Sequence, residues 1–164
     1  MRPPIRLAAV VLLGVALPAA AAQLAVSFVE PEKYADAGFN SSSPNAKERE
    51  QVQRELEQHL TKLADTKLAA DDSLKIDVLD IDLAGHLDPF VSAGREMRIV
   101  RDVTWPRIKL RYALTRNGAV ALQGEELVSD MNFLMAGNRY SSADRLRYEK
   151  AMLDDWFDRV FVQR

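Results

Sequence analysis

The strongest constraint on the fold is the Asn117-Gly118 dipeptide, which separates two apolar runs, residues 104–116 and 119–129. Asn-Gly between runs of this kind is a strong signal for a β-hairpin. At a strand's period of two, one face of the first run is apolar and carries Ile108, Leu110, Tyr112 and Leu114. The other face carries Trp105, Arg107, Lys109 and Arg111. The sequence therefore predicts an antiparallel pair with one apolar face and one cationic face.

Two registers fit this hairpin: one with a two-residue turn, and one with a three-residue loop that sets Tyr112 opposite Leu122. We prefer the three-residue loop because it keeps more of one face apolar. Lys109 lies opposite a glutamate in either case, Glu126 in the first register and Glu125 in the second.

Two further strands are expected upstream of the hairpin. Residues 24–29 predict the first, ended by Pro31. Residues 74–83 predict the second, whose apolar face changes phase at Val78–Leu79. That strand either carries a bulge there or is covered in part on both faces. Residues 85–94 are expected to form a loop, and residues 97–100 to form a short strand or the start of the next one.

Two helices complete the chain. Asn45 is the expected N-cap of the first, with Glu48 as its capping-box partner. The second runs from residue 143 to about residue 162, capped by Ser141 or Ser142. The apolar stripe of the first helix is formed by Val52, Leu56, Leu60 and Leu63. The stripe of the second helix is formed by Leu146, Leu153, either Trp156 or Phe157, and Val160. The resulting β-α-β-β-β-α order predicts an α+β fold: a two-layer α/β sandwich with a mostly antiparallel sheet and the helices on one face.

The N-terminus has the pattern of an export signal. Two arginines precede an apolar run, residues 7–17, which Pro18 breaks before a stretch of small residues. This pattern predicts a signal peptide of residues 1–22, cut after Ala22. The alternative is an uncleaved anchor, but the run has 11 residues and a membrane-spanning helix needs about 20. We expect residues 23–164 to form a single periplasmic domain without a transmembrane segment.

Composition excludes some classes of function. Without its signal peptide the chain carries 20 Lys and Arg against 24 Asp and Glu, a formal net charge of −4. This acidic balance and the export signal argue against a nucleic-acid partner. There is no cysteine, so neither a disulfide nor a thiol nucleophile is available. The sequence has no Gly-x-Ser-x-Gly elbow and no phosphate-binding glycine loop, and we expect no cofactor.

Few residues suggest catalysis. His59 is expected on the surface of the first helix, and His86 in a loop. Asp80 and Asp82 project from one face of a strand and are weak candidates for a Ca²⁺ site, together with acidic residues of a later strand. EF-hand spacing is absent. A carboxylate-based, possibly metal-dependent hydrolase using Asp80 and Asp82 is therefore the alternative function.

The cationic face of the hairpin suggests binding instead. If the aspartate-rich strand at 74–83 lies beside the hairpin, its carboxylates pair with the cations of the hairpin across the two strands and neutralise them. Otherwise Trp105, Arg107, Lys109 and Arg111 are candidates to bind an anionic component of the cell envelope or another periplasmic protein. We interpret the chain as a non-enzymatic binding or accessory module of the envelope. A structural subunit that assembles through a sheet edge is a third possibility.

Five stretches together resemble a bacterial family of exported proteins, the domain of unknown function 3016. They are "VSFVEPEKYADAG" (26–38), "DIDLAG" (80–85), "RDVTWPRIKLRYALTRNG" (101–118), "GEELVSDMNF" (124–133) and "YEKAMLDDWF" (148–157). The resemblance covers nearly all of the chain after the signal peptide. It implies a single domain behind that peptide, and it brings no known activity and no functional residues.

Overall fold

A four-stranded sheet forms the centre of the computed structural model, which describes residues 22–92, 95–135 and 137–163. Its order is β1 (Gln23–Phe28), β2 (Ser73–Asp82), β5 (Arg107–Arg116) and β6 (Ala119–Ser129). β1 is parallel to β2, and the other neighbours are antiparallel. This confirms an α+β fold with a mostly antiparallel sheet. Residues 1–21 of the predicted signal peptide lie outside the described residues.

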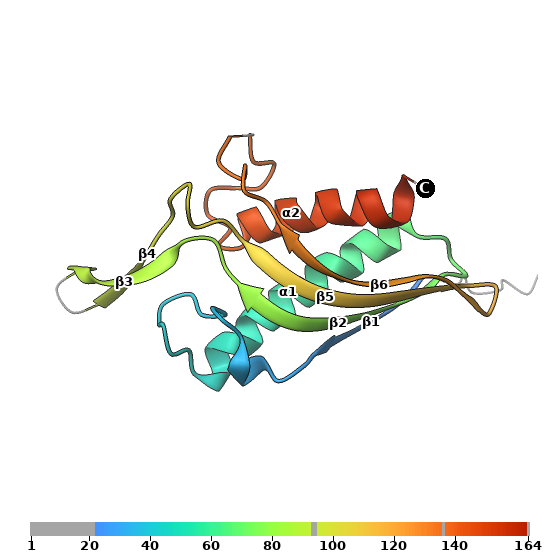
Figure 1. The fold of residues 1–164 in the computed structure, drawn as a ribbon, viewed down its shortest axis with the longest axis horizontal. Helices are drawn as coiled ribbons and strands as arrows, with labels where there is room; N and C mark the ends of the chain where they lie inside the picture. The colour runs from blue at the N-terminus through green and yellow to red at the C-terminus, as the bar shows by residue number, and fades with distance from the viewer. Residues whose placement is uncertain (1–21, 93–94, 136, 164) are drawn as a thin grey trace, which may run out of the picture.

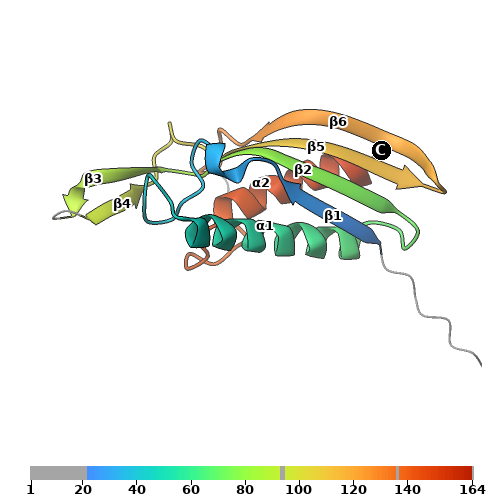
Figure 2. The same cartoon turned by 90° about the horizontal axis from the view of Figure 1, so that it is seen from below.

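Both helices lie against the same face of the sheet (Figures 1 and 2). They are α1 (Ala46–Lys67) and α2 (Arg147–Phe157), and a π-helical turn, Asp158–Val162, continues α2. The predicted stripes of both helices are buried against the apolar side chains of β2 and β5. Burial of this kind stabilises a fold by about 25 cal/mol per Å² of apolar surface. Edge-to-face contacts of Trp156 with Tyr112 and Phe161 strengthen the packing of α2.

A second, two-stranded sheet extends away from the main one (Figure 1). It consists of β3 (His86–Ser92) and β4 (Arg95–Ile99), so the expected loop at 85–94 is wrong. The predicted element order omits both strands and is corrected to β-α-β-β-β-β-β-α. The pair lies outside the main core, so a repeating buried face, the usual signature of a strand in a sequence, does not mark it.

The hairpin register differs from the preferred one. Asn117 and Gly118 both have positive φ angles, 49° and 76°, and form a two-residue turn. A bulge then leaves Ala121 without a direct partner and sets Tyr112 opposite Gly124. A Cβ at Gly124 would lie 2.7 Å from the Tyr112 hydroxyl, so this register depends on glycine. Lys109 consequently lies opposite Leu127, and not opposite a glutamate.

The phase change in β2 is a bulge, as one of the two interpretations predicted. The register shifts between Val78 and Asp80, so Val78 and Ile81 are both buried. The same shift sets Asp80 opposite Lys109 and Asp82 opposite Arg107. The aspartate-rich strand is therefore a neighbour of the cationic one.

One helix cap was predicted correctly and the other was not. The Asn45 side chain accepts a hydrogen bond from the Glu48 amide at 3.0 Å. The Glu48 carboxylate accepts from the Asn40 amide at 2.6 Å and not from the Asn45 amide, so the predicted capping-box role of Glu48 is wrong and its bond extends the cap into the preceding loop. α2 begins at Arg147 and not at residue 143, and no side chain caps it. Ser141 instead accepts from the Ala143 amide within a turn.

Candidate functional site

The structure pairs the predicted cationic row with carboxylates across the open face of the sheet. Arg107 donates to Asp82, with its Nε at 3.0 Å from Oδ2. Lys109 and Arg111 share Glu125, at 3.0 and 3.1 Å. Hydrogen bonds from Lys109 and then Arg111 lower the pKa of the Glu125 carboxyl. Each of these three cations is therefore neutralised in part within the sheet.

Trp105 lies just before β5, next to this row. The Arg107 guanidinium carbon lies 5.9 Å from the centre of the Trp105 ring. Such a cation–π contact contributes roughly 0.5–1 kcal/mol at an exposed site. Trp105 therefore helps to position Arg107, which already binds Asp82. Whether the row also binds a partner stays a prediction.

The two candidate metal ligands are already engaged. Asp80 accepts hydrogen bonds from the amides of Ala35 and Ile81, both at 2.9 Å, and Asp82 pairs with Arg107. Within the described ranges, no group of three or more His, Asp or Glu side chains is arranged to hold a metal ion. The geometry of Asp80 and Asp82 gives the hydrolase alternative no added support.

His59 is buried between the two helices, so its expected surface position is wrong. Its Nε2 lies 2.9 Å from Asp154 Oδ1, at an angle that leaves neither atom in an aligned hydrogen bond. The Tyr140 hydroxyl donates to Oδ2 of the same aspartate at 2.7 Å. Burial works to raise the pKa of Asp154, but contacts with His59 and Tyr140 outweigh it and hold the pKa below its usual range. These contacts join α1, α2 and the loop before α2.

A cleft of about 360 Å³ lies where the loop before α1, strand β4 and the start of α2 meet. We call it the arginine cleft and define it by Phe39, Asn40, Glu96, Arg98, Arg145, Arg147 and Tyr148. Its walls come from three segments that are distant in the sequence. The family resemblance noted from the sequence assigns no function to any of these segments.

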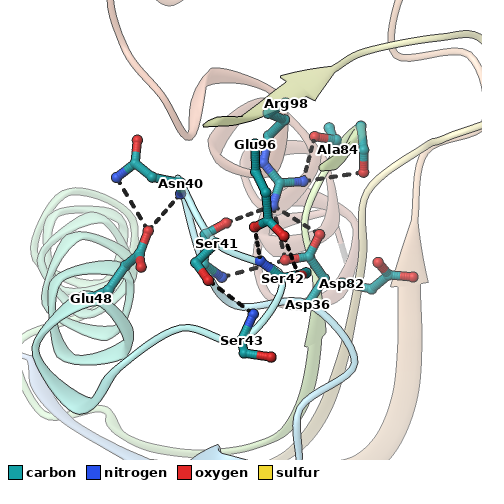
Figure 3. A network of polar contacts seen from close by, with 12 residues as sticks. Asp36, Asn40, Ser41, Ser42, Ser43, Glu48, Asp82, Ala84, Glu96 and Arg98 are labelled. Atoms are coloured by element: carbon teal, nitrogen blue, oxygen red, sulfur yellow. Dashed lines mark hydrogen bonds and ion pairs between the residues drawn. The ribbon is translucent and has the colours of Figure 1, made fainter. Parts of the chain in front are cut away.

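Arg98 holds the back of the arginine cleft together (Figure 3). Its guanidinium donates to both carboxylate oxygens of Asp36 at 2.8 Å, to the Gly38 carbonyl at 2.5 Å and to the Ala84 carbonyl at 3.2 Å. Burial raises the pKa of the Asp36 carboxyl, and Arg98 offsets only part of that effect. Arg98 is thus a structural residue whose charge is already neutralised.

The two carboxylates in the cleft wall also have partners. Glu96 accepts from the backbone amide and the hydroxyl of Ser42, at 2.6 and 2.7 Å (Figure 3). Asp144, the other acidic residue of the wall, accepts from the Leu146 amide at 2.9 Å and pairs with Lys150 at 2.7 Å. Neither carboxylate neutralises an arginine of the cleft.

The charges of Arg145 and Arg147 are therefore not neutralised by a carboxylate of the cleft wall. Arg145 lies over the Phe39 ring at 4.9 Å, and Arg147 over the Tyr148 ring at 4.5 Å. Arg147 also donates to the Tyr148 hydroxyl and the Ser142 carbonyl, at 2.6 and 3.1 Å. In the part of the chain that the structure describes, neither guanidinium has an acidic partner. Two arginines held on aromatic rings are suited to bind a carboxylate or a phosphate through paired N–H donors.

A buried acid lies behind this site. Glu149, on the first turn of α2, is 1% exposed. Its Oε1 accepts from the Ala84 amide at 2.7 Å, while Oε2 has no partner among the described residues. Burial raises the pKa of Glu149 to about 6. Because Ala84 lines the arginine cleft, this acid supports the cleft wall without reaching its open side.

Sequence reasoning missed the arginine cleft. The local signal was Arg145-Leu-Arg147-Tyr148, which places an aromatic residue directly beside a cation. The second aromatic residue, Phe39, is more than a hundred residues away. Only the fold brings it under Arg145.

Comparisons with known proteins place the chain in a family. The model of the family described as "Protein of unknown function (DUF3016)" matches residues 22–159. No curated protein and no solved structure matches the chain. Among the described residues, no helix has the length and apolar character needed to cross a bilayer. The match spans most of the sequence, and the chain therefore belongs to the DUF3016 family of proteins of unknown function.

Proposed function

We propose that the chain is an exported, periplasmic and non-enzymatic binding module of the cell envelope, and that it binds an anionic group in the arginine cleft. The observation that supports this most is the pair Arg145 and Arg147. Both guanidiniums are held over aromatic rings and keep N–H donors that no carboxylate of the described chain uses. Residues 1–22 would direct export, and residues 23–164 would form the single domain.

The chemistry of the cleft favours a carboxylate or phosphate group carried by an envelope component. Hydrogen bonds from guanidinium to an anionic oxygen are short and about twice as strong as neutral ones. The cleft is partly lined by apolar and aromatic side chains, including Phe39 and Tyr148. Its volume suits a headgroup or a single residue of a polymer.

The cationic row of β5 is a weaker candidate for the same role. Arg107, Lys109 and Arg111 would each have to leave an existing acidic partner before binding an external anion. The row is retained as the second candidate surface because its face of the sheet is uncovered (Figure 2). A role as hydrolase has less support, since both Asp80 and Asp82 are engaged within the protein.

A titration of the purified protein with inorganic phosphate, and separately with acetate, tests the proposal. Backbone amide shifts in NMR spectra would report binding and its location. We expect saturable shifts around the cleft that weaken with added salt, because exposed charges are screened within ~8 Å at physiological ionic strength. The ion that binds more tightly indicates whether phosphate or carboxylate is recognised.

Matched variants separate the two surfaces. Arg145→Gln with Arg147→Gln should weaken binding roughly tenfold or more, because hydrogen bonds to charged groups contribute about 1.5–3 kcal/mol each. Arg107→Gln with Arg111→Gln changes the charge equally and should leave binding intact. If only the Arg107→Gln with Arg111→Gln variant bound the anion more weakly, the binding site would be on the sheet face. If both variants bound it as tightly as the unchanged protein, neither the cleft nor the row would be the site.

A further inference from the structure

Strand β6 forms one edge of the main sheet. The order β1-β2-β5-β6 leaves one side of its backbone without a neighbouring strand. Among the described residues, no segment other than β5 forms backbone hydrogen bonds with it. Alternate N–H and C=O groups of an edge strand point away from the sheet and can accept another strand. β6 is also the longest strand, at 11 residues.

A groove of about 400 Å³ runs beside this edge. Five consecutive residues, 126–130, form one wall, and α2 supplies the other wall through Met152, Asp155 and Trp156. A strand edge facing a helix across a groove is the geometry in which extended peptides bind by strand addition. The peptide backbone pairs with the strand, and its alternating side chains contact the helix.

The side chains of the groove indicate the character of the occupant. Met152 and Trp156 of α2 supply apolar surface to the lining, so apolar contacts are available on the helix side. Leu127, 56% exposed, is opposite Lys109 and lies on the open face of the sheet. The groove lining contains Glu126, Asp130 and Asp155 against one cation, Arg159. Glu126 pairs with Arg159, and Asp155 pairs with Arg139 at 2.7 Å, so Asp130 is the carboxylate of the lining that keeps no cationic partner among the described residues. This single surplus negative charge favours a segment that carries basic residues.

We propose that β6 and α2 form a binding groove for an extended, basic polypeptide segment of another protein, which adds to the sheet as a fifth strand. This site shares no residue with the arginine cleft, so it goes beyond the function proposed above. A second copy of the chain fits the groove less well. It would bring an identical acidic lining to the same edge and set like charges against each other.

Two synthetic heptapeptides of alternating valine and lysine, or of alternating valine and glutamate, test the proposal. Alternation places the charged side chains on one face and the valines on the other. Amide hydrogen exchange of the purified protein is measured with and without each peptide. We expect the lysine peptide to slow exchange at alternate residues of β6 between 125 and 129, and the glutamate peptide to have no effect.

Charge-reversed variants test the lining. Asp130→Lys with Asp155→Lys should weaken binding of the lysine peptide by roughly threefold or more, because exposed charge pairs contribute up to about a factor of five each. Glu50→Lys with Glu57→Lys on α1 makes the same change in net charge outside the groove and should bind as the unchanged protein does. Thermal melting checks that each variant is folded.

Three results would overturn the proposal. The first is a lysine peptide that protects no β6 amide or protects amides elsewhere. The second is equal binding of both peptides, which would remove the charge preference. The third is dimerisation in light scattering with β6 amides already protected in the absence of peptide, which would make a second copy the occupant.

Discussion

Replacing Glu149 by glutamine should remove a pH-dependent loss of stability. The Glu149 carboxyl is fully buried, and burial raises its pKa from 4.5 to about 6. One oxygen accepts from the Ala84 amide and the other has no partner in the described structure. Glutamine keeps the carbonyl oxygen that accepts this bond and cannot ionise, so it isolates the effect of the charge.

The magnitude follows from the difference between the folded and unfolded pKa values. Each pKa unit corresponds to about 1.4 kcal/mol, so a rise of roughly 1.5 units gives about 2 kcal/mol. Below pH 4.5 the acid is protonated in both states and has no effect on stability. Between pH 4.5 and 6 the folded state binds more protons, so the free energy of unfolding falls as pH rises. Above pH 6 nearly the whole loss is present.

Urea denaturation at intervals from pH 4 to 7.5 measures this effect. The difference in unfolding free energy between Glu149→Gln and the unchanged protein should shift by about 2 kcal/mol in favour of the variant across that range. Glu57→Gln, at an exposed position of α1, is the control and should give a parallel profile. If the Glu149→Gln profile were also parallel to that of the unchanged protein, the argument that Glu149 is buried and ionised at pH 7 would be wrong.

Three further substitutions test the fold itself. Gly124→Ala places a Cβ 2.7 Å from the Tyr112 hydroxyl and should destabilise the protein by about 1–3 kcal/mol in urea denaturation. Gly137→Ala is the control: a Cβ there has no atom within 4 Å, so this change should have little effect. Asn45→Ala removes the cap of α1 and should lower the unfolding free energy by about 1 kcal/mol; an unchanged midpoint would show that Glu48 and the loop suffice. His59→Ala removes one of the groups that contact the buried Asp154 carboxylate, while Tyr140 and Arg139 remain beside it, and should lower stability by about 1–3 kcal/mol. A melting temperature like that of the unchanged protein would contradict this role for His59.

Local periodicity in the sequence predicted much of the fold. The apolar face of β5 and the apolar stripes of both helices can each be recognised within a single stretch of sequence. Each is buried as its spacing indicates. The bulge in β2 was visible as a phase change between Val78 and Leu79 for the same reason. The Asn45 cap depends on residues three apart and was equally accessible.

Features that depend on two distant segments could not be predicted in this way. The register of β6 is set by the fit of Gly124 under Tyr112 and by the bulge at Ala121, and counting apolar faces favoured a different pairing. His59 is buried because α2 supplies Asp154 beside it. The arginine cleft depends on Phe39 and Arg145 meeting across the fold, and no spacing within either segment indicates that contact.

The position of Arg98 connects the projecting β3–β4 pair to the shape of the cleft. Arg98 belongs to β4, yet its guanidinium is anchored to Asp36 and Gly38 of the central body. Glu96 of the same strand is tied to Ser42. Because both residues also line the arginine cleft, a tilt of the projecting pair would have to break these contacts or change the width of the cleft. If an anion binds in the cleft as proposed, a partner that shifted the β3–β4 pair would change the affinity for that anion, and the bound anion would change the affinity for the partner by the same factor.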